Sequence, residues 1–164
     1  IKAKHSGIVY GCKLYPAGAT TNSEYGVTNI SNIHTCLQTM SDIGLPLLVH
    51  GEVTDPDIDI FDREKYFIDE ELHQIRKSFQ DLKIVLEHVS SDYGVDFVKT
   101  NNNIAGTITP HHMLLTKKDV FKDDEVNPHH YCMPVVKNEN DLLSLRKAAC
   151  FNNSKFLIHL EINL

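Results

Sequence analysis

Short apolar runs alternate with amphipathic segments along most of the sequence. Apolar side chains recur every three or four positions over residues 28–43, which predicts a helix capped by Thr28 or Asn29 and ended by Gly44 and Pro46. Further helices are predicted to start near residues 62, 90 and 138. The predicted strands are residues 7–12, 45–49, 82–86, 104–109 and 155–160. Alternating strands and helices are typical of βαβ units and predict a parallel sheet in an α/β protein.

The chain length limits how many such units can form. With 164 residues the chain can build one sizeable core, so we expect residues 1–164 to form a single domain. A complete (β/α)8 barrel takes about 250 residues. About five strands are predicted here, so a whole barrel does not fit, whereas a partial (β/α)8 TIM barrel does.

The charge balance restricts the partners. The net charge is −6 and the isoelectric point is near 5.9, which gives no support to nucleic-acid or anionic-membrane binding, and we expect neither. No apolar run approaches the roughly 20 residues of a membrane helix. The four cysteines form no CxxC pair and are expected to be reduced and mostly buried, as in a cytoplasmic protein. The start at residues 1–5, without methionine, indicates a cut inside a longer protein.

Lys13, His50 and His88 each stand where a predicted strand ends. In parallel α/β proteins the carboxyl ends of the strands share one edge, where ligands and catalytic groups gather. Neutral imidazole is a common zinc ligand. The Lys13 ammonium has no acceptor, so it can ligate a metal only after its amine has reacted with carbon dioxide to give a carbamate. The alternative is an ordinary lysine that reaches solvent or pairs with a carboxylate.

Five motifs, in this order, carry a resemblance to a known family. They are KLYPAGATTN, PLLVHGEVTDPDIDIFDRE, IVLEHVSS, ITPHH and HHYCMPVVK. Over residues 12–137 the chain resembles dihydroorotase of the monofunctional, bacterial-type branch of the amidohydrolase superfamily. The resemblance implies a barrel of the metal-dependent hydrolase type. It also implies the reversible cyclisation of N-carbamoyl-L-aspartate to L-dihydroorotate in de novo pyrimidine synthesis.

The same resemblance implies site residues and cofactors. A complete site would hold two Zn²⁺ ions, bridged by a carbamate formed from carbon dioxide on Lys13, with His50 and His88 on the second zinc. The implied substrate-binding residues are Thr20 and Thr21, on a loop that closes over the substrate, and Met133, whose backbone contacts the pyrimidine ring. The partner is then a small-molecule substrate, and a homodimer is an expected assembly.

The chain departs from the family pattern at both ends. The first-strand His-x-His pair and the substrate-carboxylate anchors have no counterpart, because the sequence starts downstream of them. At the other end Glu161 lies near the position of the family's proton-shuttling aspartate, but its neighbours do not match. No catalytic residue is therefore assigned, and we expect the isolated 164-residue chain to be incomplete and inactive.

Several other polar residues have simpler interpretations. His111 and the pair His129–His130 are expected to be structural or to support the site through hydrogen bonds. Glu87 precedes His88 and is predicted to point to the opposite face of the strand, in a packing or salt-bridge role. Glu52 and residues 57–62 are predicted to form a solvated acidic loop.

Two other functions stay open at this point. One is a non-catalytic, dihydroorotase-like protein that has lost its metals and serves as a structural or partner-binding domain. The other is a different cyclic amidase, such as a dihydropyrimidinase. Zinc content and a carbamate on Lys13 distinguish the first from an enzyme, and turnover of dihydropyrimidines but not of dihydroorotate identifies the second.

Overall fold

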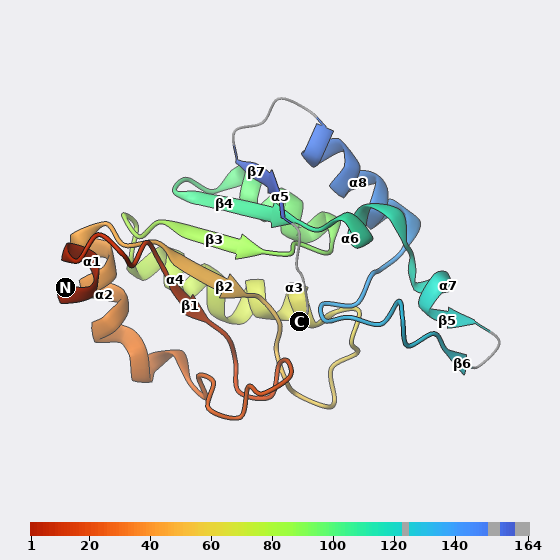
Figure 1. Ribbon diagram of the computed structural model, residues 1–164, viewed down its shortest axis with the longest axis horizontal. Coiled ribbons are helices and arrows are strands. Elements are labelled where there is room, and N and C mark those ends of the chain that lie inside the picture. The colour runs from red at the N-terminus through yellow and green to blue at the C-terminus, as the bar shows by residue number, and fades with distance from the viewer. Residues whose placement is uncertain (123–124, 151–154, 160–164) are drawn as a thin grey trace.

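The computed structural model describes residues 1–122, 125–150 and 155–159. At its centre lies a five-stranded sheet in which every strand is parallel to its neighbours, in the order β1-β2-β3-β4-β7 (Figure 1). The strands are β1 (Cys12–Leu14), β2 (Leu47–His50), β3 (Ile84–Glu87), β4 (Ile104–Ile108) and β7 (Phe156–Ile158). The predicted parallel α/β sheet is confirmed, although each strand is shorter than the run that predicted it.

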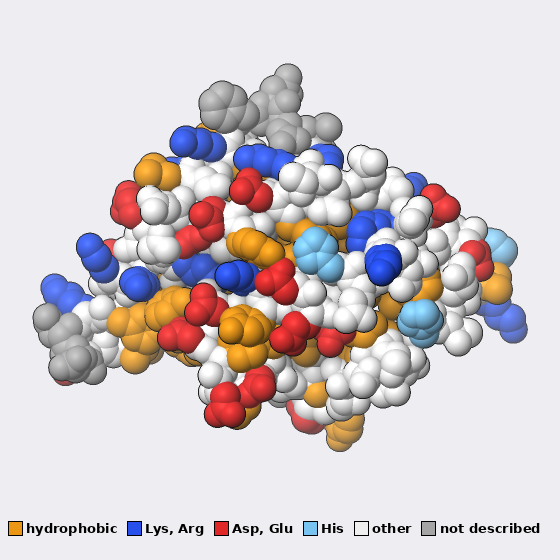
Figure 2. All heavy atoms as spheres, turned by 180° about the vertical axis from the view of Figure 1, so that it is seen from behind, with side chains coloured by type: hydrophobic (Ala, Val, Ile, Leu, Met, Phe, Trp, Pro, Cys, Tyr) orange, Lys and Arg blue, Asp and Glu red, His pale blue; other side chains and the backbone are white. Residues whose placement is uncertain are grey.

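Helices lie against one face of the sheet, and the other face is turned toward the viewer in Figure 1. The helical elements are α1 (Lys2–His5), η1 (Ile30–Ile33), α2 (His34–Ile43), α3 (Arg63–Phe67), η2 (Ile68–Leu72), α4 (His73–Ser78), α5 (Asp92–Thr100), α6 (Pro110–Leu114), α7 (Lys117–Val120) and α8 (Glu139–Cys150). A small antiparallel hairpin joins β5 (Phe121–Lys122) to β6 (Glu125–Val126). Figure 2 shows acidic and basic side chains interspersed over the helix-covered face. No helix in the described ranges is long and apolar enough to cross a membrane.

Side chains alternate across the sheet as the strand period requires. Leu47, Val49, Ile84 and Leu86 face the helices and are at most 2% exposed. Their neighbours on the opposite face, such as Leu48, are only half-buried. The short, continuous apolar run at residues 45–49 predicts a strand buried on both faces. Within the described residues, one face is fully packed and the other is left more open.

The helix starts and stops that the sequence predicts are present. The Asn29 side chain accepts a hydrogen bond of 2.8 Å from the Ser31 amide and begins the 3-10 turn that leads into α2. Gly44 ends α2 in the left-handed region, with φ of 65°, where a glycine carries no steric penalty. Ser91 caps α5 by accepting from the Gly94 amide at 2.9 Å.

The first predicted strand is wrong over most of its length. Residues 7–11 are not in a strand, and Ile8 and Tyr10 are each 79% exposed. Pairing begins only where the Cys12 amide donates to the Pro46 carbonyl, at 3.0 Å. Because Pro46 has no amide hydrogen, it cannot return a bond to the preceding residues, and the ladder stops there.

Three smaller expectations are also corrected. In the helix predicted to start near residue 62, the apolar pattern places Tyr66 on the inner face. In the structure Tyr66 is 43% exposed, because its neighbour Phe67 occupies the packed side. The apolar segment over residues 131–134 predicts a buried piece of chain, but Tyr131 is also 43% exposed. The charged residues of segment 117–128 predict an exposed loop, but this segment contains α7 and the β5–β6 hairpin.

The cysteines are more accessible than predicted. Cys36 and Cys150 are exposed, while Cys12 and Cys132 are half-buried. In the described part of the chain these four residues form no disulfide. The expected burial of the cysteines is therefore wrong.

Two leucines of α8 differ strongly in how deeply they are buried. Leu145 is 1% exposed and Leu143 is 42% exposed. We expect Leu145→Ala to lower the free energy of unfolding by about 2–5 kcal/mol, because it leaves a cavity in the core. Leu143→Ala makes the same chemical change in the same helix and should cost less than about 1 kcal/mol. Denaturant titration measures both, and equal effects would contradict this assignment of the core.

Candidate active site

A cavity of about 760 Å³ lies at the carboxyl ends of the first three strands. Its wall includes every residue that the sequence analysis singled out for metal or substrate binding. These residues are Lys13, Thr20, Thr21, His50, His88 and Met133. Tyr15, Tyr131 and Cys132 complete much of the remaining wall. Side chains up to 120 residues apart in the sequence (Lys13 and Met133) therefore share one cavity.

His50 and His88 form the buried part of the cavity wall. Each is 3% exposed, and His50 Nδ1 lies 3.2 Å from His88 Nε2. His50 ends β2, and His88 follows β3 directly, in a backbone conformation with φ of 42°. Burial, together with the nearby His50 and Lys13, lowers the pKa of His88 well below its ordinary value. The His88 imidazole is therefore neutral, the form in which an imidazole can ligate a metal.

Glu52 is a site residue that the sequence analysis missed. It was assigned to a solvated loop, but it is 1% exposed, and its Oε2 accepts a hydrogen bond of 3.0 Å from His50 Nε2. Because the Glu52 carboxylate accepts this bond, the His50 proton stays on Nε2. The lone pair on His50 Nδ1 is then directed toward His88. Within the described residues the second oxygen of Glu52 is buried without a hydrogen-bond partner. The signal in the sequence was the spacing, because Glu52 stands two residues after His50.

The two histidines fit the geometry of one tetrahedral zinc ion. Zn–N bonds of 2.0–2.1 Å at a tetrahedral angle place two nitrogens about 3.3 Å apart. The separation of His50 Nδ1 from His88 Nε2 is 3.2 Å. A histidine that ligates zinc usually donates its other N–H to a carboxylate, as His50 does to Glu52. In the described ranges no three His, Cys, Asp or Glu side chains converge as a metal-binding group, so a further ligand is needed.

Lys13 lies on β1 and forms an ion pair with Glu87, at the end of β3. The side chain of Lys13 is 37% exposed and that of Glu87 is 19% exposed. The predicted salt-bridge role of Glu87 is therefore present. Its predicted position opposite His88 is wrong, because the positive φ of His88 breaks the strand alternation and both residues reach the same side.

Thr20 and Thr21 lie on a loop held in shape by its own backbone. At the base of this loop, the Ala17 amide donates to the Val27 carbonyl at 3.0 Å, and the Val27 amide donates to the Tyr15 carbonyl at 2.9 Å. Gly26 is needed there, since an added Cβ would lie 2.7 Å from the Ala17 nitrogen. Both threonines are exposed, so their hydroxyls can reach a molecule in the cavity.

A buried histidine supports the turn that carries Met133. His112 is 2% exposed, and its Nε2 donates to the Pro134 carbonyl at 2.9 Å. Its Nδ1 accepts from the Thr109 hydroxyl at 2.5 Å. Burial and the neighbouring His111 lower the pKa of His112 to about 3, so the ring stays neutral and both bonds persist. His111 was the expected supporting residue in this motif, whereas in the structure its neighbour His112 forms the bonds to the turn.

The remaining histidine candidates lie away from the cavity wall. His111 is half-buried, with its Nε2 3.4 Å from the Thr109 hydroxyl oxygen. His129 is exposed, whereas the His130 ring contacts Asn127. Glu161 lies outside the described residues.

The chain is similar in sequence to proteins of known family. No protein-family model matches the chain. Its sequence is 49% identical over 159 residues to a dihydroorotase of Hahella chejuensis, and the match covers 96% of this chain and 46% of the relative. The chain is a homologue of dihydroorotases. It spans about half the length of the curated relatives it matches.

Solved dihydroorotase structures share the fold. The enzyme from Campylobacter jejuni matches with a TM-score of 0.87 and 38% identity, over 96% of this chain and 45% of that one. The enzyme from Saccharomyces cerevisiae, solved with 5-fluoroorotic acid, matches with a TM-score of 0.83 and 33% identity, over 96% and 46%. These proteins are TIM-barrel amidohydrolases, so the predicted partial barrel is confirmed. L-hydantoinase (dihydropyrimidinase) from Arthrobacter aurescens, at 16% identity and a TM-score of 0.68 over 87% of this chain and 36% of that one, shares the fold alone.

The His112 bonds lead to a test of how the turn is supported. We expect His112→Ala to lower the free energy of unfolding by about 2–4 kcal/mol, because it removes two buried hydrogen bonds, one to the Thr109 hydroxyl and one to the Pro134 carbonyl. Thr109→Val removes one of the two bonds and should cost about half as much. The exposed His129→Ala is the matched control, expected within about 0.5 kcal/mol of the parent. If His112→Ala is as harmless in denaturant titration as the control, the turn does not depend on this ring.

Proposed function

We propose that the protein to which this chain belongs is a dihydroorotase. It cyclises N-carbamoyl-L-aspartate to L-dihydroorotate reversibly, in the pyrimidine pathway of the cytoplasm. The observation that carries the proposal is the convergence of Lys13, His50 and His88 on one cavity, at the carboxyl ends of three parallel strands. The homology over 96% of the chain supports it. That residues 1–164 form one domain and that the protein is a homodimer stay predictions.

The metal ligands of this proposal are His50, His88 and a carbamate on Lys13. Zinc, when bound, supplies Lewis-acid polarisation of an amide carbonyl and lowers the pKa of bound water. Glu52 holds His50 in the tautomer with a free Nδ1. Lys13 must leave its ion pair with Glu87 and lose a proton before its amine can react with carbon dioxide. Glu87 therefore stabilises the unreacted lysine, and metal binding favours the carbamate.

The substrate side of the cavity is assigned to the loop and to the turn. The hydroxyls of Thr20 and Thr21 are donors and acceptors suited to the carboxylate and ureido groups of the substrate. The backbone of Met133 offers groups for the edge of the ring, on a turn supported by His112. Closure of the loop would exclude water from the cavity and strengthen these polar contacts.

A chimera tests the proposed activity without requiring the isolated chain to be active. Residues 12–137 replace the matching segment of the Hahella chejuensis dihydroorotase, and hydrolysis of L-dihydroorotate is followed by chromatography. We expect turnover, and a loss of about a hundredfold or more in His50→Ala and His88→Ala, since each removes one metal ligand. The exposed His34→Ala is the control and should leave turnover unchanged.

The same chimera separates the alternative functions. A folded chimera that hydrolyses dihydrouracil but not dihydroorotate would replace the proposal with a dihydropyrimidinase. A folded chimera that turns over neither compound and holds no zinc would favour the non-catalytic interpretation.

The hydrogen bond between Glu52 and His50 leads us to expect that substitutions of Glu52 change the affinity for zinc. In the chimera, Glu52→Ala should weaken zinc binding by about 10–100-fold, because the orientation and basicity of His50 are lost. Glu52→Gln keeps an acceptor for the His50 N–H and should weaken zinc binding less. Competition with a chelating indicator measures the affinity, with the exposed Glu24→Ala as control. An unchanged affinity in Glu52→Ala would mean that Glu52 does not serve the metal ligand.

A further inference from the structure

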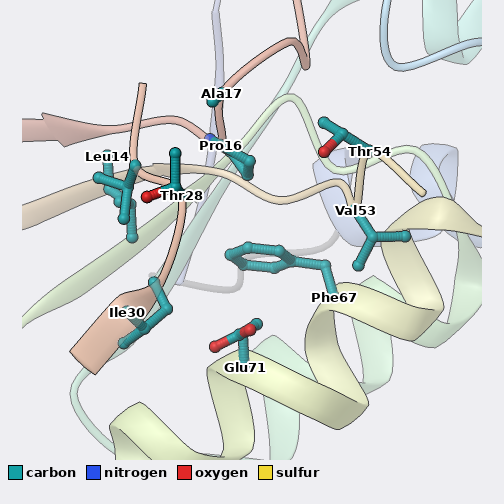
Figure 3. A pocket seen from close by; sticks show the side chains of 10 residues that line it. Leu14, Pro16, Ala17, Thr28, Ile30, Val53, Thr54, Phe67 and Glu71 are labelled. Atoms are coloured by element: carbon teal, nitrogen blue, oxygen red, sulfur yellow. The ribbon is translucent and has the colours of Figure 1, made fainter. Parts of the chain in front are cut away.

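A second cavity, of about 390 Å³, lies at the base of the loop that carries Thr20 and Thr21. None of its lining residues lines the candidate active site. Most of its wall is apolar and includes Leu14, Val53 and Phe67, and Figure 3 shows the Phe67 ring projecting between the surrounding segments. Small-molecule sites are typically apolar cavities of about 300–1,000 Å³ with a few polar groups. This cavity has both properties.

Glu71 supplies the charged group of this wall. Figure 3 shows its carboxylate rising from the helix toward Ile30 and Phe67. Burial and the like charge of Glu70 raise the pKa of Glu71. Over the described ranges, no hydrogen bond or ion pair is formed by the Glu71 side chain. A carboxylate that is partly desolvated and lacks a counter-ion favours a cationic partner in the cavity.

The helix that carries Glu71 is irregular at this position. Glu71 belongs to η2, a π-helical turn over Ile68–Leu72 that separates α3 from α4. Such turns are rare, and they occur frequently at functional sites because the extra residue changes the direction of the side chains. Thr28 and Thr54 add two hydroxyls to the cavity wall. The irregular turn thus points, independently of the cavity, to a site at Glu71.

We propose that this cavity binds a small amphiphilic cation, a ring or short aliphatic group that bears a primary ammonium. The apolar part lies against Phe67 and Leu14, and the ammonium pairs with the Glu71 carboxylate, with the hydroxyls of Thr28 and Thr54 as further acceptors. The ligand touches Pro16 and Ala17, at the base of the loop whose tip reaches the active-site cavity. The site does not depend on the proposed dihydroorotase activity.

Three probes of the same size test the charge and the apolar part together. The 164-residue chain is titrated with benzylamine, benzyl alcohol and benzoate, and binding is followed by amide chemical shifts in NMR. We expect saturable binding of benzylamine, weaker binding of the uncharged alcohol and none of benzoate. The shifts should centre on the amides of Ala17, Val27 and Val53. Equal binding of the alcohol, no saturable binding of benzylamine, or shifts centred on Lys13 and Tyr131 would overturn the proposal.

A pair of adjacent carboxylates supplies the matched variants. Glu71→Gln keeps the shape of the wall and should weaken benzylamine binding about tenfold, the loss of one charged hydrogen bond. Glu70→Gln removes an exposed charge outside the cavity wall and should change the affinity by less than about twofold. Circular dichroism verifies that both variants are folded. Equal affinities for the two variants would overturn the assignment to Glu71.

Discussion

The parallel register of β1, β2 and β3 is the constraint on which the site depends. Lys13 pairs with Leu48, Leu48 pairs with Val85, and His50 pairs with Glu87. Lys13, two positions below the level of His50, reaches Glu87 across the intervening strand. A shift of one residue in any pair would turn one of these side chains toward the helices, because strand side chains alternate. The site therefore depends on how the three strands pair, and not only on which residues stand at their ends.

The sequence predicts those parts of the molecule that rest on local signals. An apolar run that ends in a polar residue predicted His50 and His88 at one edge, and the comparisons confirm the barrel in which they lie. Residues 7–11 do not form a strand because they have no strand to pair with. The neighbouring strand offers no further backbone donor at Pro46. Glu52 and His112 were missed because their burial depends on segments far from them. Their side chains look like those of ordinary polar loop residues until the chain is folded.

Lys13 has two possible charge states in the cavity, a positive ammonium and a negative carbamate. As an ammonium it is balanced by Glu87, and its positive charge helps to keep His88 neutral. As a carbamate it would carry a negative charge close to the Glu87 carboxylate, which is unfavourable in a partly buried site. Bound cations would offset that repulsion. The geometry therefore couples carbamate formation to metal binding, and neither is expected to be stable without the other.

The loop over residues 15–27 belongs to both cavities. Tyr15, Thr20 and Thr21 line the candidate active site, while Pro16, Ala17 and Val27 line the second cavity. The backbone hydrogen bonds that Val27 forms with Ala17 and Tyr15 close the loop on itself, so a short segment connects its base to its tip. A ligand that orders the base of the loop also restricts the tip. Closing the tip then costs less conformational entropy. Any such coupling is reciprocal, so a molecule held under Thr20 and Thr21 would equally strengthen binding beside Glu71.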